Sequence, residues 1–246
     1  MRQPGTCADK RRRSGAAADP NYRNGWPADG SSEPNVMWQY LFDEGTGDIT
    51  DEVGAVTLAT TGSPTYGVTA SGLFINLSPG ISYASTQRHS TTAFTNAAIA
   101  TNQDFTFEAY FIKSVVAAAD YLLMETVDGT GENFYIDFRS SINIIQVRLN
   151  TSTGLVNASF TVASSSYSDG NPHKLRVTAD RSGNAELFID GVSYGTIDIS
   201  TAAGKVDADS FAIGNEVAGS FPFRGTILSA RWSNNITNNS GGPGGG

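Results

Sequence analysis

Acidic residues gather in two glycine-containing stretches, and carboxylates held in turns are the usual protein ligands of calcium. The first stretch contains Asp43, Glu44, Asp48 and Asp51, and the second contains Asp128 and Glu132. Ca²⁺ takes six to eight oxygen ligands, so a site requires two or three acids brought together by loops. Asp and Gly also recur in such loops simply as turn formers. Both interpretations stay open; if calcium binds, Asp43, Asp48 and Asp51 are the expected ligands, and no other cofactor is expected.

Other metal-dependent or nucleophilic chemistry lacks the residues that it needs. The two histidines, His89 and His173, belong to no H-E-x-x-H motif and to no Cys/His cluster, so a zinc site has no support. We expect His173 to cap or pack at the entry of a strand. The single cysteine, Cys7, excludes an internal disulfide. Neither G-x-S-x-G nor the phosphate-binding G-x-x-x-x-G-K-[ST] is present, which argues against those hydrolase and nucleotide-binding classes.

The elements that must position these residues are β-strands, and the stretch 172–199 shows this most clearly. Leu175, Val177 and Ala179 alternate with polar residues, which is the period of a half-buried strand. Residues 180–184, DRSGN, then form a turn signal, and a second strand follows up to the Asp190-Gly191 turn. The pattern predicts an antiparallel meander of three strands.

The same alternation continues over most of the chain. The stripe of Phe105, Phe107, Ala109 and Phe111 predicts a core strand. Further strands are expected around residues 36–42, 73–77, 81–83, 121–124, 134–138, 144–149, 155–162, 211–214 and 223–232, with a short helical turn at 97–100. Roughly 12 to 14 strands suit two apposed antiparallel sheets. We therefore predict an all-β protein with an arm at 1–35, a β-sandwich at 36–234 and an Asn/Gly-rich tail at 235–246.

Five of these segments resemble the laminin-G-like modules of the concanavalin A-like lectin/glucanase superfamily. They are W38-QYLFDEGTG-47, D104-FTFEAYF-111, H173-KLRVTAD-180 with L187-FIDG-191, F211-AIG-214 and F223-RGTILSARW-232. The resemblance implies a jelly-roll sandwich and, in many members, a calcium site. The sequence departs from the family pattern at Pro172, where a tryptophan is usual, and at Leu228 and Ser229, where acidic residues often stand.

The resemblance also raises the question of catalysis, because many glucanases share this fold. Their catalytic acids lie two and four residues apart on one strand, so that alternation places them on one face. The nearest candidates here, Glu125 with Asp128 and Glu186 with Asp190, lack that spacing and run into turns. We therefore expect a module that is not an enzyme, with a glycoside hydrolase as the weakest alternative.

Sugar binding requires exposed aromatic rings together with amide or carboxylate partners. Aromatic residues near predicted loops are Tyr66, Tyr83, Tyr167, Phe221 and Phe223, although such residues also pack in cores. We expect a loop site formed by Asp128, Glu132, Asn133 and Tyr167.

Charge is distributed unevenly along the chain. The net charge is −8, yet residues 1–24 hold six basic and two acidic residues, so the other 222 residues carry −12. A basic arm on an acidic globule suggests docking to a partner through Arg11, Arg12, Arg13, Tyr22 and Trp26. Such a globule is unsuited to nucleic acid, and no apolar run is long enough to span a bilayer.

Two settings for a binding or assembly module follow. No apolar stretch follows the N-terminal arginines, so either a secretion signal has been removed or the general secretion route is not used. We favour a virion protein of a tailed bacteriophage, a capsid decoration or tail-associated subunit within an oligomeric assembly, that docks on other virion proteins and binds a cell-surface glycan. The alternative is a carbohydrate-binding module of a secreted bacterial protein.

Overall fold

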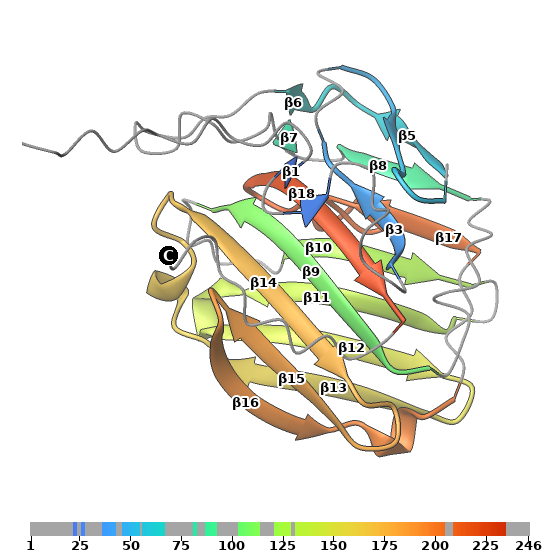
Figure 1. Cartoon of the computed structure of the whole chain (residues 1–246), viewed down its shortest axis with the longest axis vertical. Coiled ribbons are helices and arrows are strands. Elements are labelled where there is room, and N and C mark those ends of the chain that lie inside the picture. Colours follow the sequence, from blue (N-terminus) through green and yellow to red (C-terminus); the bar gives the residue numbers. More distant parts are fainter. Residues whose placement is uncertain are drawn as a thin grey trace, which may run out of the picture.

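The computed structural model shows an all-β protein in which two antiparallel sheets pack face to face (Figure 1). It describes residues 22–23, 26–27, 36–42, 46–54, 56–66, 81–82, 87–92, 103–113, 121–128, 131–204 and 209–234. The predicted strand at 73–77 and the helical turn at 97–100 lie outside these residues. The prediction of an antiparallel jelly-roll sandwich is confirmed.

One sheet, called sheet I, contains eight strands in the order β13-β12-β11-β10-β17-β8-β5-β4. In Figure 1 its central strands lie behind those of the other sheet. The bounds are β13 (Gly154–Thr161), β12 (Ile144–Thr151), β11 (Asn133–Arg139), β10 (Tyr121–Val127), β17 (Ser210–Ile213), β8 (Arg88–Thr91), β5 (Thr57–Thr61) and β4 (Ile49–Thr50). The strands from β10 to β13 follow one another in sequence and in space, so this half of the sheet is built from hairpins.

The other sheet, sheet II, has the order β16-β15-β14-β9-β18-β7-β6, and β3 also pairs with β18. Strand β18 pairs with β9 over its whole length on one side. On its other side it pairs with β7 at its start and with β3 at its end. The bounds are β16 (Val192–Asp198), β15 (Asn184–Ile189), β14 (Pro172–Ala179), β9 (Phe105–Ile112), β18 (Thr226–Ser233), β7 (Ile81–Ser82), β6 (Thr65–Tyr66) and β3 (Val36–Tyr40).

The core lies between the sheets and is rich in aromatic rings. The predicted stripe on β9 is buried, and Phe105 stacks on Trp232 with ring centroids 4.1 Å apart. Trp38 contacts both Phe107 and Phe211, which joins β3 and β9 of sheet II to β17 of sheet I. The two layers are therefore closed by apolar side chains alternating along each strand.

Strands of four or more residues agree in number with the 12 to 14 expected from the sequence, and short pairings add to them. Thirteen of the strands in the described residues have four or more residues, and the remaining five are two-residue pairings, including β1 (Tyr22–Arg23) with β2 (Trp26–Pro27). The helices there are single 3₁₀ turns, η1 (Ser140–Ile142), η2 (Ser164–Ser166) and η3 (Ser200–Ala202). In the described residues no helix is long and apolar enough to span a membrane.

Candidate functional site

The outer face of sheet I, which points away from the core, carries polar side chains on three consecutive strands. On β11, Phe134, Ile136 and Phe138 are buried in the core, so Tyr135 and Asp137 point outward. The same alternation places Gln146 and Arg148 of β12 on this face, and Asn157, Ser159 and Thr161 of β13. The face therefore combines an aromatic ring with amides, hydroxyls and charges.

Strand register brings four of these side chains into one line, which we call the Tyr135 row. Glu125 of β10 lies opposite Tyr135, Tyr135 lies opposite Arg148, and Arg148 lies opposite Asn157. Residues directly opposite each other on antiparallel strands have Cβ atoms about 5 Å apart. A carboxylate, a phenol ring, a guanidinium and an amide thus follow one another across the sheet.

The contacts within the row are long and few. Arg148 Nη1 donates to the Tyr135 hydroxyl at 3.5 Å, and the guanidinium carbon lies 5.5 Å from the centre of the Tyr135 ring. That hydroxyl donates to Gln146 Oε1, also at 3.5 Å, whereas Gln146 Nε2 donates to Ser159 Oγ at 2.9 Å. Hydrogen bonds of 3.5 Å are at the limit of the usual range, so Arg148 and Tyr135 are weakly satisfied by their neighbours.

One end of the row is fixed by the loop at 214–223. Glu125 Oε2 accepts the backbone N–H of Val217 at 2.8 Å, and Glu216 Oε1 accepts that of Ser220 at 3.0 Å. Burial raises the pKa of Glu125; the bond from Val217 opposes this, and the nearby Glu216 adds to it. This loop also carries Phe221, whose side chain is 42% exposed. The loop that holds one end of the row thus also carries a solvent-exposed aromatic ring.

The structure places three of the four predicted loop residues beside this face. Asn133 opens β11 next to the row, and its Oδ1 is shielded from solvent without a hydrogen-bond partner in the described residues. Asp128 Oδ1 accepts the N–H of Glu132 at 2.7 Å, which closes the loop between β10 and β11. Asn150 Nδ2 donates to Gly131 O of the same loop. Asp128 and Glu132 thus shape the end of the face.

Tyr167 does not belong to that group, which corrects the prediction of a ligand contact. Its side chain is fully buried, its ring lies 5.3 Å from that of Phe138, and its hydroxyl donates to Ser140 Oγ. A ring enclosed in the core cannot stack on a sugar. Of the other aromatic candidates, Phe223 is buried, Tyr66 is half-buried with its hydroxyl donating to Gly47 O, and Tyr83 lies outside the described residues.

One of the proposed calcium ligands, Asp51, lies in a tightly bonded turn. Asp51 Oδ1 accepts the N–H groups of Gln39 and Val53, and Oδ2 accepts that of Gly54. Burial raises the pKa of Asp51, and these three bonds oppose the rise. Its oxygens therefore close the turn between β4 and β5 and bond it to β3, which is the turn-forming alternative for this residue.

The other two proposed ligands remain predictions. Asp48 accepts Thr60 N–H at 2.8 Å, and Asp43 lies outside the described residues. In those residues no group of three His, Cys, Asp or Glu side chains has the geometry to hold an ion.

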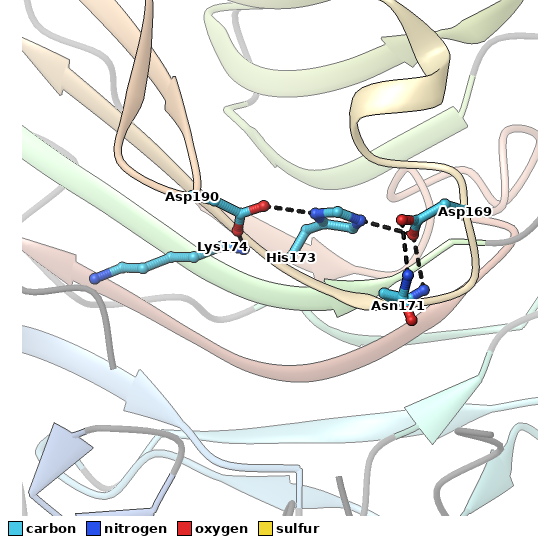
Figure 2. Close-up of polar contacts among 5 residues, drawn as sticks. All are labelled: Asp169, Asn171, His173, Lys174 and Asp190. Atoms are coloured by element: carbon cyan, nitrogen blue, oxygen red, sulfur yellow. Dashed lines mark hydrogen bonds and ion pairs between the residues drawn. The ribbon is translucent and has the colours of Figure 1, made fainter. Parts of the chain in front are cut away.

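A second polar cluster joins two loops at one end of the sandwich (Figure 2). His173 enters β14 and points inward against Phe111, as expected for a strand-entry residue. Its Nδ1 lies 2.7 Å from Asp190 Oδ2 and its Nε2 lies 2.9 Å from Asp169 Oδ1. Carboxylates only accept, so both ring nitrogens must carry protons for both bonds to form. The cluster clamps the β13–β14 connection to the β15–β16 turn.

Protonation of this cluster follows from its contacts. Burial lowers the pKa of His173, but the hydrogen bonds and charges of Asp190 and Asp169 outweigh burial, so the pKa is raised above its ordinary value. The bond from His173 lowers the pKa of Asp169 to about 2. Asp190 has a φ of 52° and accepts Lys174 N–H at 2.8 Å. With Gly191 at a φ of 81°, it forms the two-residue hairpin turn that its Asp-Gly sequence favours.

The predicted docking arm is only partly described. Arg11, Arg12 and Arg13 lie outside the described residues, and Tyr22 and Trp26 lie on the paired strands β1 and β2. The role of the arm in docking therefore stays a prediction.

Tyr135, Gln146, Arg148 and Asn157 were not among the residues expected from the sequence, because that expectation considered loops and not strand faces. A signal was present. Polar residues alternate with apolar ones at 135 and 137, at 146 and 148, and at 157, 159 and 161, and these positions include one tyrosine and one arginine. The pairing of those strands, however, could be known only from the structure.

Fold and site together define a jelly-roll β-sandwich with a polar, aromatic outer face. The chain belongs to the concanavalin A-like lectin/glucanases superfamily, whose laminin-G-like family model matches residues 85–239. The predicted resemblance is thus confirmed. No curated protein matches the chain as a relative.

Several solved binding domains share the fold at low sequence identity. The binding domain of Paraclostridial mosquitocidal protein 1 has a TM-score of 0.62 at 12% identity, over 84% of this chain and 50% of that one. A botulinum neurotoxin type C structure, reported for cell entry that depends on two ganglioside molecules, has a TM-score of 0.58 at 12% identity, over 83% and 49%. The CBM40 module of a Ruminococcus gnavus sialidase, bound to α2,6-sialyllactose, has a TM-score of 0.52 at 16% identity, over 65% and 92%. The chain thus spans about half the length of the toxin domains.

Proposed function

We propose that this protein is a non-catalytic module that binds glycans on the outer face of sheet I. The observation that carries the proposal is the Tyr135 row, in which an aromatic ring lies between Glu125 and Arg148 on neighbouring strands. Sugar rings have apolar faces and hydroxyl edges, so they are recognised by an aromatic side chain flanked by charged and amide groups. Asn133 lies two residues from Tyr135 on the same strand, and the loop that bonds Glu125 carries the exposed Phe221.

Similar proteins support a binding function without defining this ligand. The sialidase module was solved with a sialylated sugar, and cell entry of the type C toxin depends on gangliosides. Both share the fold of this chain at 16% identity or less. Their recognition of glycans makes a glycan the first ligand class to test.

A glycan array followed by titration calorimetry tests the proposal. We expect a defined set of oligosaccharides to bind, and Tyr135→Ala to weaken the binding at least tenfold. Tyr135→Phe should retain most of the affinity if ring stacking dominates. Tyr194→Ala, a tyrosine substitution on β16 of sheet II, is the matched control and should leave affinity unchanged. An array without a bound glycan, or equal binding by Tyr135→Ala, would exclude this face as the site.

The absence of catalysis is part of the proposal. The outer-face acids have partners other than each other, because Glu125 accepts the Val217 N–H and Asp137 pairs with Arg139 at 2.8 Å. A retaining glycosidase needs two carboxyl groups about 5 Å apart, one of them free to attack. Incubation of any bound polysaccharide with the protein should release no reducing ends, and release above that of a Glu125→Gln variant would show hydrolysis.

The setting of the module is proposed from charge alone. The excess of four positive charges in residues 1–24 against twelve negative charges in the rest supports docking of the arm on an acidic partner surface. We favour the virion of a tailed bacteriophage, with a secreted bacterial protein as the alternative. Deletion of residues 1–30 should abolish incorporation into particles and leave the melting temperature unchanged, whereas normal incorporation would contradict this role of the arm.

A further inference from the structure

The guanidinium of Arg148 is the least satisfied cation on the outer face of sheet I. Arginine has five N–H donors in a planar fork. In the described part of the chain, Arg148 makes one hydrogen bond, the 3.5 Å contact with the Tyr135 hydroxyl, and its Nε is shielded from solvent without a partner. A donor without an acceptor is energetically unfavourable, so an acceptor that a ligand brings to the guanidinium would be favoured.

The acidic side chains near Arg148, Asp137 and Glu125, are bonded to other groups. Asp137 on the adjacent strand is paired with Arg139, Nε to Oδ2 at 2.8 Å. Glu125 contributes a favourable electrostatic interaction with Arg148, but its Oε2 is engaged by the Val217 N–H, and burial raises its pKa. Among the described residues no carboxylate forms an ion pair with Arg148. In a protein with a net charge of −8, a cation left without an ion pair is notable.

We propose that the glycan recognised by this face is acidic, and that its carboxylate is bound by the fork of Arg148 while a sugar ring packs on Tyr135. This inference rests on the function proposed above and specifies its ligand class. The planar fork matches a carboxylate through two parallel hydrogen bonds, which supply both charge and direction. Asn133, two residues from Tyr135 on β11, adds an amide beside the row, and its shielded Oδ1 has no hydrogen-bond partner in the described residues.

Two matched pairs of probes test the inference with the full chain. The first pair is 6′-sialyllactose and lactose, and the second is a hyaluronan hexasaccharide and its carboxyl methyl ester. We expect at least one acidic probe to bind tenfold or more tightly than its neutral partner by calorimetry. The preference should diminish as NaCl is raised from 50 to 500 mM, because salt screens the ion pair.

Three variants assign the preference to one side chain. Arg148→Gln should abolish the difference between acidic and neutral probes, and Arg148→Lys should retain part of it, since lysine supplies charge without the fork. Arg139→Gln removes the same charge from the same face, two strand positions from Asp137, and should keep the preference. Melting curves for all three verify folding, and the probe pairs test the wild-type chain independently of any variant.

Outcomes separate this inference from the proposed function. Equal affinity for acidic and neutral glycans, or a preference that survives in Arg148→Gln, overturns the acidic class while glycan binding stands. Binding of only sulfated sugars on the array also overturns the carboxylate assignment. Failure of every array glycan to bind removes both proposals together.

Discussion

Arginines on the outer faces of the two sheets differ in how many ion pairs and hydrogen bonds they form. On sheet II, Arg231 is 2% exposed, and its Nε and Nη2 both contact Glu108 Oε2. The other oxygen of Glu108 is 2.5 Å from Lys174 Nζ. On sheet I, Arg148 has one long hydrogen bond and no ion pair among the described residues. Both arginines are held by strands of one sandwich, so the difference separates a charge that maintains the fold from a charge that we propose binds a ligand.

The largest effect should come from breaking the ion pair on sheet II. Glu108→Gln leaves two cations beside an uncharged amide, and a buried charge that loses its partner destabilises by about 3–5 kcal/mol. Urea unfolding monitored by tryptophan fluorescence measures this loss. The double variant Glu108→Leu with Arg231→Met should recover part of it, because the deeply buried charge of Arg231 is then absent and only the more exposed Lys174 has lost its partner. A single variant as stable as the parent would contradict a structural role for Glu108.

A smaller loss is expected at the turn between β15 and β16. Asp190→Ala removes the acceptor of the Lys174 N–H and one partner of His173. It also places alanine, whose side chain cannot hydrogen-bond to the backbone, at a φ of 52°. We expect a loss of about 1–3 kcal/mol in unfolding free energy. Asp190→Gly, which tolerates that φ, isolates the side-chain contacts and should lose less. Equal losses would assign the whole effect to those contacts.

The His173 cluster predicts a particular pH dependence. The raised pKa of His173 stabilises the folded protein below its ordinary value of 6.5, and this contribution is lost as pH rises through the raised value. The lowered pKa of Asp169 stabilises above 3.8, and this contribution is lost as pH falls toward about 2. The difference in unfolding free energy between the parent and His173→Gln should therefore be largest between about pH 3.8 and pH 6.5, where both contributions are present. A difference that grows above pH 8 would contradict the assignment.

The smallest effect on stability should be that of Arg148. Arg148→Gln removes a donor that lacks a partner and one weak hydrogen bond, so we expect a change within about 0.5 kcal/mol. Measured beside Glu108→Gln under the same conditions, this variant sharpens the contrast between the two faces. A loss above 2 kcal/mol would show that Arg148 is a structural residue.

Sequence predicted the parts of this fold that depend on local pattern. Alternation identified the meander, the stripe of Phe105 to Phe111 and the hairpin strands of sheet I, and Asp-Gly identified a turn. Pairing between distant strands was beyond reach, since Glu108 and Arg231 are 123 residues apart in sequence. The Tyr135 row was missed for a different reason: its strands follow one another in sequence, but the alternation of residues does not define their register.

The roles of single side chains were harder to predict than the strands, as Tyr167 and Asp51 show. Tyr167 is surrounded by serines, which suggested a surface loop, yet its ring fills the core above Phe138. Asp51 was named as a calcium ligand or a turn former; its oxygens accept three backbone N–H groups, and calcium binding stays a prediction. The ring of Tyr167 packs in the core and the carboxylate of Asp51 bonds a turn, and residue type alone reveals neither role.

Strand β18 has a consequence for biosynthesis. It is the last strand described, and it supplies the neighbouring backbone for β3, β7 and β9 at once. While the nascent polypeptide emerges from the ribosome, the hairpins from β10 to β13 can assemble early, whereas β3 must wait for residues 226–233 before finding its hydrogen-bonding partner. We expect a polypeptide halted at Gly225 to remain protease-sensitive in its N-terminal third.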